Sequence, residues 1–334
     1  SMYIKSKNYT ALLQVMLVDE QGKPVSTQLV LDVKGKEWTK LTGTLKPDKD
    51  VKRGMLAIQP LGKGQFQLDV VSLFPSDTWD NGKSVFRADI MQNLKEYAPD
   101  FIRFPGGCIV HGVNEATMYH WKKTIGPIEN RPGQWSKWAP YYRTDGIGYH
   151  EFYELCEYLG ADAMYVIPTG MICTGWVKQS SPWNFIQPDV DLDAYIQDAL
   201  DAIEYAIGPE TSKWGALRVK NGHPKPFPLK YIEIGNEDFG PVYWERYEKI
   251  YQALHRQYPD LIYIANSIIG KENDDKRIDI AKFVNPKNVK VFDEHHYQPV
   301  EWACKQHYRF DNYERGIADL FVGELGIDGK YPYN

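Results

Sequence analysis

The pattern of apolar and polar positions changes near residue 75 of the 334-residue chain. Before that point, short runs in which apolar and polar residues alternate, such as 12–18 and 28–32, are separated by turn-forming clusters at 20–23, 34–36 and 61–64. Alternation with a period of two is typical of strands with one buried face, and Gly-containing clusters favour tight turns. We therefore predict that residues 1–75 form a small β-sandwich, or a fragment of one.

After residue 78, segments with helical spacing alternate with short, mostly apolar segments. Helices are predicted at 86–97, 149–159, 192–207 and 242–257, near 278–284 and near 313. Strands are predicted at 101–104, 163–168, 231–235, 261–266, 289–295 and 320–323. Short strands of mostly apolar residues are typical of a parallel sheet that is covered on both faces.

Residues 76–334 are therefore assigned to the α/β class, as either a doubly wound sheet or a barrel. A doubly wound nucleotide-binding fold would carry a GxGxxG loop, which the segment 104–107 lacks. Polar residues directly follow the strands, where the active sites of barrels lie. We predict a (β/α)8 TIM barrel in which two of the eight strands are not recognisable. The open sheet edges that this leaves would lack hydrogen-bond partners, so self-association into a homo-oligomer is expected.

Composition narrows the range of partners. Hydrophobic residues make up 43% of the chain, charged residues 25%, and the net charge is -5, which is ordinary for a globular protein. No long basic run and no apolar run of membrane-spanning length occurs, so we expect neither nucleic acid nor a membrane as partner. The 4 cysteines lack the spacing of a metal site, and no metal or cofactor is expected. The 14% aromatic content suits either stacking on sugar rings or a large aromatic core.

Two glutamates come directly after apolar strands. Glu237 ends the segment 232–237, and Glu324 ends the segment 321–324. A partly apolar cleft disfavours the charged form of a carboxyl group, so Glu237 could hold the proton that a general acid needs. Two carboxyl groups at the mouth of one barrel are the minimum for glycoside hydrolysis. The structural alternatives are a helix N-terminal or hydrogen-bonded role for Glu237 and a solvated loop carboxylate at Glu324.

Two further segments carry candidate residues. We expect His295 and Tyr297 to line the site, because a Tyr hydroxyl can hold a carboxylate in place and a His can orient it. Metal binding by His295 and His296 is the alternative, but neighbouring residues of a strand point to opposite faces. In the segment 103–108, glycines let the backbone approach a ligand. Cys108 has no recognisable base nearby, which favours packing or sugar contact over nucleophilic chemistry.

Taken together, these segments resemble glycoside hydrolase family 51, the α-L-arabinofuranosidases, in a wide clan of barrel hydrolases. The matching segments are 101–108, 119–132, 144–151, 234–237, 293–297 and 322–324. The resemblance implies that Glu237 is the acid/base and Glu324 the nucleophile of a retaining mechanism. It also implies that the sugar subsite is lined by Asn236, His295, Tyr297, Cys108 and Trp121.

The resemblance implies an exo-hydrolase that releases terminal L-arabinofuranose from plant polysaccharides such as arabinoxylan or arabinan, without a cofactor. Residues 1–75 are then part of a carbohydrate-binding jelly roll, and the recognisable strands are strands two to seven of the barrel. The chain is in that case an excerpt of a longer protein or a truncated product. The alternatives are an endo-acting xylanase or glucanase on the same barrel and a non-catalytic carbohydrate-binding protein. A polysaccharide-degrading role favours secretion or the periplasm.

Overall fold

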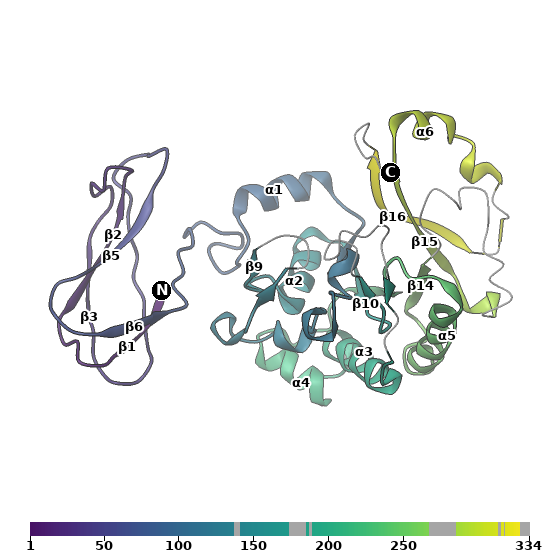
Figure 1. Ribbon diagram of the computed structural model, residues 1–334, viewed down its shortest axis with the longest axis horizontal. Coiled ribbons are helices and arrows are strands. Elements are labelled where there is room, and N and C mark those ends of the chain that lie inside the picture. Colours follow the sequence, from purple (N-terminus) through teal and green to yellow (C-terminus); the bar gives the residue numbers. More distant parts are fainter. Residues whose placement is uncertain are drawn as a thin grey trace. The chain divides into compact units, whose positions relative to one another are not determined.

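The computed structural model describes residues 1–136, 141–173, 185–186, 189–266, 285–312, 315–316 and 318–327. The chain divides into two compact units, Ser1–Ser84 and Val85–Asn334, and each is described by itself (Figure 1). This division lies somewhat after the predicted boundary at residue 75. Among the helices that the structure describes, none is long and apolar enough to cross a membrane.

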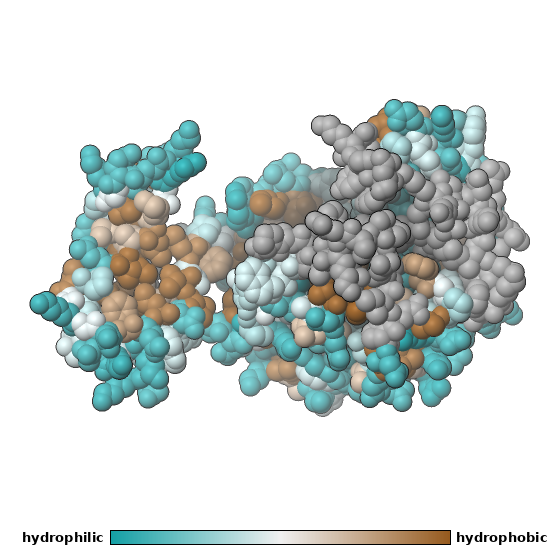
Figure 2. All heavy atoms as spheres, in the orientation of Figure 1, coloured by the Kyte–Doolittle hydropathy of each residue, from teal (hydrophilic) through white to brown (hydrophobic). Residues whose placement is uncertain are grey.

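The first unit consists of two three-stranded antiparallel sheets, with strand orders β4-β1-β6 and β3-β2-β5. The strands are β1 (Met2–Ser6), β2 (Leu12–Val18), β3 (Leu29–Asp32), β4 (Thr39–Leu41), β5 (Met55–Pro60) and β6 (Phe66–Asp69). Alternation along β1 and β2 directs Ile4 and Leu13 inward, where they join Tyr9 and Val33 in a small core. Apolar side chains such as Val30 stay exposed, because so small a unit cannot bury both faces of its strands. Figure 2 shows apolar residues gathered on the surface of this unit.

The second unit contains one parallel sheet of six strands whose order in space follows their order along the chain. The strands are β7 (Phe101–Phe104), β10 (Asp162–Ile167), β13 (Leu229–Ile234), β14 (Ile262–Asn266), β15 (Val291–Gln298) and β16 (Asp319–Ile327). All the predicted strands of this region are present, and β15 and β16 extend further than predicted. The carboxyl ends of parallel strands lie at the same end of the sheet. The residues that follow β7 and β13 therefore lie near the last residues of β15 and β16.

The sheet curls until its two edge strands approach each other. The rings of Phe101 on β7 and Phe321 on β16 pack edge to face with centroids 5.5 Å apart. Nearby, Nη1 of Arg103 on β7 donates to Oε1 of Glu324 on β16 at 3.1 Å. The two strands contact through these side chains but are not neighbours in the hydrogen-bonded sheet. The result is a nearly closed, barrel-like α/β fold.

Helices cover this sheet. Their bounds are α1 (Ala88–Tyr97), α2 (Tyr149–Leu159), α3 (Leu192–Ile207), α4 (Lys213–Lys220), α5 (Gly240–Gln257) and α6 (Val300–Lys305). The start of α3 illustrates the local cause, because the side chain of Asp191 accepts from the backbone N–H of Ala194. The longer helices were predicted, whereas α4 and α6 were not. The helices predicted near 278–284 and near 313 lie outside the described residues.

The loops of the second unit contain short elements. They are β8 (Gln134–Trp135), β9 (Tyr142–Arg143), β11 (Ile172–Cys173), β12 (Phe185–Ile186), η1 (Gly107–Ile109), η2 (Glu115–Thr117), η3 (Trp121–Lys123), η4 (Ile128–Asn130), η7 (Pro286–Asn288) and η8 (Arg309–Asn312). Four of the 3-10 helices follow β7, so the chain makes a long excursion between β7 and α2 before it returns to the sheet. This excursion carries Cys108 to the site.

The core of the second unit is rich in aromatic side chains. Tyr149 and Tyr153 from α2 and Tyr243 and Trp244 from α5 are almost completely inaccessible to solvent. Their rings pack in tilted and edge-to-face pairs, such as Tyr149 with Tyr165 of β10, at 4.6 Å between centroids. Much of the high aromatic content therefore serves packing between helices and sheet, which is one of the two roles the composition suggested.

Candidate active site

Glu237 stands on a sharp turn at the end of β13. Gly235 has a φ of +89°, and a Cβ there would lie 2.2 Å from Oδ2 of Asp238, so no other residue fits. Glu237 itself has a φ of 55°, a left-handed conformation that raises the energy of a non-glycine residue by about 1–3 kcal/mol. The surrounding contacts hold this conformation, which is typical of functional positions.

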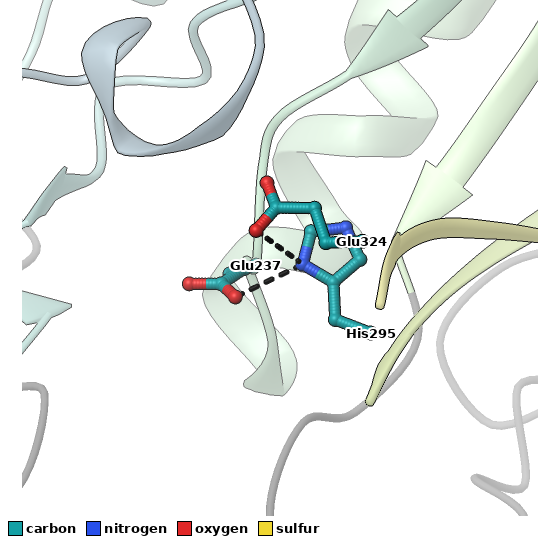
Figure 3. A group of neighbouring side chains, drawn as sticks. All are labelled: Glu237, His295 and Glu324. Carbon is teal, nitrogen blue, oxygen red and sulfur yellow. Dashed lines mark hydrogen bonds and ion pairs between the residues drawn. The ribbon is translucent and has the colours of Figure 1, made fainter. Parts of the chain in front are cut away.

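The side chains of Glu237, His295 and Glu324 converge from β13, β15 and β16 (Figure 3). Nδ1 of His295 lies 2.9 Å from Oε1 of Glu237 and 3.6 Å from Oε2 of Glu324. One ligand atom from each of the three residues lies within 4.8 Å of those of the other two. One oxygen of the Glu237 carboxyl group therefore lies within 4.8 Å of one oxygen of the Glu324 carboxyl group.

His295 is a cation at neutral pH. Burial alone lowers its pKa, but its hydrogen bonds with Asp293 and Glu237 outweigh that effect and raise the pKa to about 10. Nε2 of His295 lies 2.8 Å from Oδ2 of Asp293, so both ring nitrogens face carboxylates and both can donate. A protonated imidazole that donates to carboxyl groups on both sides can orient them for acid–base chemistry.

Glu324 is held by two donors. The hydroxyl of Tyr297 donates to its Oε2, and Nη1 of Arg103 donates to its Oε1 at 3.1 Å. The carboxylate keeps 19% of its side-chain surface exposed, more than Glu237 does. A fixed, partly accessible carboxylate beside a cation is what a nucleophile requires.

A buried charge network centred on Arg103 adjoins the two glutamates. Its Nε donates to Oε2 of Glu233 at 2.5 Å, and its Nη2 donates to Oδ1 of Asn236 at 2.6 Å. Burial is the largest effect on the pKa of Glu233 and raises it, while the charge of Arg103 lowers it. The net result is a pKa of about 7. Asp293 accepts from the backbone N–H of Gly323 at 2.7 Å, which ties β15 to β16.

The sequence-based interpretation missed Arg103, Glu233 and Asp293. Asp293 stands in β15 among other polar residues, whereas Arg103 and Glu233 stand inside strands that are otherwise mostly apolar. A charged residue in such a position has to be paired, and that signal could have identified the network. Arg103 holds Asn236 and Glu324 by hydrogen bonds, and Asp293 holds His295. The network thereby fixes the surroundings of both glutamates.

Most of the predicted substrate-binding residues meet at this site. Sγ of Cys108 lies 3.7 Å from Oε2 of Glu237, and Nδ2 of Asn236 lies 4.0 Å from the same sulfur. His295 contacts Glu237, and Tyr297 contacts Glu324. The structure thus brings these residues around the two glutamates. Their roles toward a sugar remain a prediction.

Trp121 is the exception. Its side chain is completely buried, its indole N–H donates to the carbonyl of Asp198 at 3.2 Å, and its ring packs on Trp214 at 4.9 Å between centroids. The ring therefore belongs to the core between η3 and the helices α3 and α4. Because a buried ring presents no surface to a ligand, the structure does not place Trp121 in a sugar subsite, and we withdraw that assignment.

Known proteins identify the family. The model of the α-L-arabinofuranosidase 1 domain matches residues 93–315. The chain belongs to this family. It is 34% identical over 331 residues to the extracellular exo-α-L-arabinofuranosidase of Streptomyces chartreusis, covering 95% of this chain and 38% of that protein. It is 34% identical over 295 residues to α-L-arabinofuranosidase 1 of Arabidopsis thaliana, covering 88% of this chain and 40% of that protein.

A solved structure supports the same family assignment. The arabinose-bound α-L-arabinofuranosidase MgGH51 superposes with a TM-score of 0.80 and 29% identity, over 97% of this chain and 50% of that one. The resemblance to family 51 that the sequence predicts is thereby confirmed. The chain spans half or less of the length of each of these relatives.

Proposed function

We propose that the protein containing this chain is a retaining exo-α-L-arabinofuranosidase that releases terminal arabinofuranosyl residues from plant polysaccharides such as arabinoxylan or arabinan. The observation that carries the proposal is the pair Glu237 and Glu324, whose ligand atoms lie within 4.8 Å of each other and of His295. This short separation favours a covalent intermediate over direct attack by water. We infer that the sugar is α-L-arabinofuranose because the similar proteins are named α-L-arabinofuranosidases.

Each residue of the site then has a defined task. The Glu324 carboxylate, held by Tyr297 and Arg103, attacks the anomeric carbon while Glu237 donates a proton to the leaving oxygen. Glu237 then acts as base and activates the water that hydrolyses the glycosyl-enzyme. The N–H of His295 that faces Glu237 holds this carboxyl group in place through both steps. Asn236 and the thiol of Cys108 lie beside Glu237, where sugar hydroxyl groups would bind.

We also propose that the six parallel strands are strands two to seven of a (β/α)8 barrel. The curl of the sheet supports this, because β7 and β16 approach through Phe101 and Phe321 without sharing backbone hydrogen bonds. Strands eight and one would occupy the space between these edges in a complete barrel. The part of the relatives that this chain does not span is long enough to supply them.

Kinetics of two variants test the chemistry. In the active protein, Glu324→Ala should abolish turnover of every arabinofuranoside, because no nucleophile remains. Glu237→Ala should lose about 10²–10⁴-fold on natural substrates but much less on aryl arabinofuranosides with good leaving groups, which need little protonation. Azide should restore turnover of Glu237→Ala on the aryl substrate, because it replaces the water that needs a base.

The matched control is Glu301→Ala, which removes an exposed carboxylate on α6 and should leave all rates unchanged. Equal losses on activated and natural substrates, without any azide effect, would contradict the assignment of Glu237. Release of oligosaccharides instead of single arabinose units would show endo action.

A further inference from the structure

Two thiols meet beside the acid/base glutamate. Sγ of Cys108, in η1, lies 2.9 Å from Sγ of Cys173, in β11, and the two residues are not joined in a disulfide. Both side chains are buried. Sγ of Cys108 also lies 3.7 Å from Oε2 of Glu237, so the pair adjoins the catalytic carboxyl group directly.

The backbone holds the two cysteines in this arrangement. The N–H of Cys173 donates to the carbonyl of Gly112 at 2.9 Å, and the N–H of Gly112 donates to the carbonyl of Cys108 at 3.0 Å. Gly112 has a φ of +62°, and a Cβ there would lie 2.5 Å from the backbone N of Met118. The loop after β7 and the strand β11 are therefore joined by main-chain bonds, and the thiols face each other because of the fold.

A buried imidazole stands next to the pair. Nε2 of His111 lies 3.0 Å from Oδ1 of Asp238. Burial lowers the pKa of His111, but the charge and hydrogen bond of Asp238, the backbone of Asn236 and the charge of Cys173 together outweigh that effect and raise the pKa. The attraction is mutual, so whatever favours the proton on His111 also favours a thiolate at Cys173. The thiolate is the form of cysteine that reacts with oxidants and disulfides.

The other two cysteines lack these features. Cys156 lies in the core of the second unit, where burial raises its pKa to about 12, so its thiol stays protonated and inert. Cys304 is exposed on α6. Within the part of the chain that the structure describes, Cys108 and Cys173 form the one thiol pair in contact. The chain therefore contains its own internal controls.

We propose that Cys108 and Cys173 form an oxidisable dithiol that inactivates the arabinose site when it closes to a disulfide. With a peroxide as oxidant, the Cys173 thiolate attacks the O–O bond, becomes a sulfenic acid and releases hydroxide. The Cys108 thiol then displaces the sulfenic hydroxyl group as water and forms the S–S bond, so that two thiols and one hydrogen peroxide give one disulfide and two waters.

Closure changes the site because a disulfide needs about 2.05 Å between its sulfurs, shorter than the present contact. Sγ of Cys108 would move toward Cys173 and lose the hydrogen that now faces Glu237 and the sugar position. The effect on activity rests on the proposed function, whereas disulfide formation itself does not.

The experiment uses a Cys304→Ser background, which removes the exposed thiol and should behave as wild type. Mild hydrogen peroxide treatment of the native protein should produce a disulfide-linked pair of peptides that contain Cys108 and Cys173. The kcat/KM for an aryl arabinofuranoside should fall about tenfold, the size of one lost polar contact, and dithiothreitol should restore it. Adding Cys173→Ser should leave the untreated rate within about twofold and abolish the reversible loss.

Two results would overturn the proposal. One is that peptide mapping finds Cys108 and Cys173 still as thiols at a peroxide dose that oxidises Cys304 in the wild type. The other is an equal, reversible loss of activity in the Cys304→Ser and the Cys304→Ser/Cys173→Ser proteins, which would mean that Cys108 is oxidised alone. If the protein does not cleave arabinofuranosides, the proposed function fails, and the peptide map still decides whether the disulfide forms.

Discussion

At the scale of single residues, the site is governed by the pairing of two cations with several carboxyl groups. Arg103 neutralises Glu233 and Glu324, while the protonated His295 bridges Glu237 and Asp293. Each cation thus joins a buried carboxyl group to one of the two glutamates that we propose to be catalytic. A buried pair is strongly destabilised when one partner is removed, because the other charge is left uncompensated. The charges are therefore part of the fold as well as of the chemistry.

The pKa of His295 leads to a prediction about stability and pH. Its value in the folded chain, about 10, is above the ordinary 6.5, so proton binding stabilises the folded state. This contribution is fully present below about pH 6.5 and is lost progressively as the pH rises to about 10. The His295→Gln variant lacks it. The difference in the free energy of unfolding between wild type and variant should therefore shrink between about pH 6 and about pH 10, as measured by urea unfolding.

His307→Gln is the matched control, since it removes an exposed histidine that lies outside the buried charge network. A difference between wild type and His295→Gln that stays constant over this range would show that folding does not raise the pKa of His295.

The sequence predicted the residues at strand ends better than those inside strands. Glu237 and Glu324 were found because a polar residue after an apolar run is conspicuous and because parallel strands end together. Arg103 was missed because nothing in one strand shows which carboxyl groups face it from other strands. Trp121 was wrongly placed because its position along the chain does not fix the direction of its side chain. Packing against Trp214 and Tyr149 determines that direction.

At the scale of elements, the turn after β13 decides the position of Glu237. Three consecutive polar residues there are buried, and each has its own anchor. Asn236 bonds to Arg103, Glu237 to His295, and Asp238 to Thr169 at 2.6 Å. The turn therefore positions Glu237, the proposed acid/base, through the backbone, and a small change in the turn should displace its carboxyl group.

Gly235→Ala tests the turn. The added methyl group would meet the carboxylate of Asp238 at 2.2 Å on a backbone with φ +89°. We expect destabilisation of about 2 kcal/mol or more and a fall in kcat, because the turn must open to admit the methyl group. Thermal melting and turnover of an aryl arabinofuranoside measure the two effects.

Gly160→Ala is the control, because Gly160 at the end of α2 has a similar φ of +71° but nothing within 4 Å of the new Cβ. It should show the backbone effect alone and leave kcat unchanged. Equal effects of the two substitutions would mean that the turn after β13 tolerates the clash and does not control Glu237.

The elements that could be predicted are those with a strong period. The apolar strands and the long amphipathic helices α3 and α5 were identified, since each buries a regular stripe of side chains. The short helix α4 was missed because it contains Gly215 and little apolar surface. Its place depends instead on the buried Arg218, which donates to the carbonyls of Tyr205 and Gly208 near the end of α3. Such tertiary contacts leave no periodic signal.

At the scale of the whole molecule, the strands β7 and β16 remain the decisive feature. They are the two edges of the parallel sheet, and in the described part of the chain each pairs with one neighbouring strand. The side-chain bridge from Arg103 to Glu324 and the contact of Phe101 with Phe321 bring the edges together. Side-chain contacts do not satisfy the backbone donors and acceptors along an edge, and those groups need partners.

We therefore predict that the 334-residue chain alone self-associates or melts at a low temperature, whereas a longer chain that adds strands one and eight is monodisperse and active. Size-exclusion chromatography and thermal melting of both proteins measure this. A charge on an edge strand blocks pairing with other chains, so Phe101→Lys on β7 should reduce self-association of the shorter chain. Phe74→Lys, at an exposed position of the first unit, should not. A monomeric, cooperatively melting and fully active 334-residue chain would show that the sheet edges need no further strands and that the proposed barrel register is wrong.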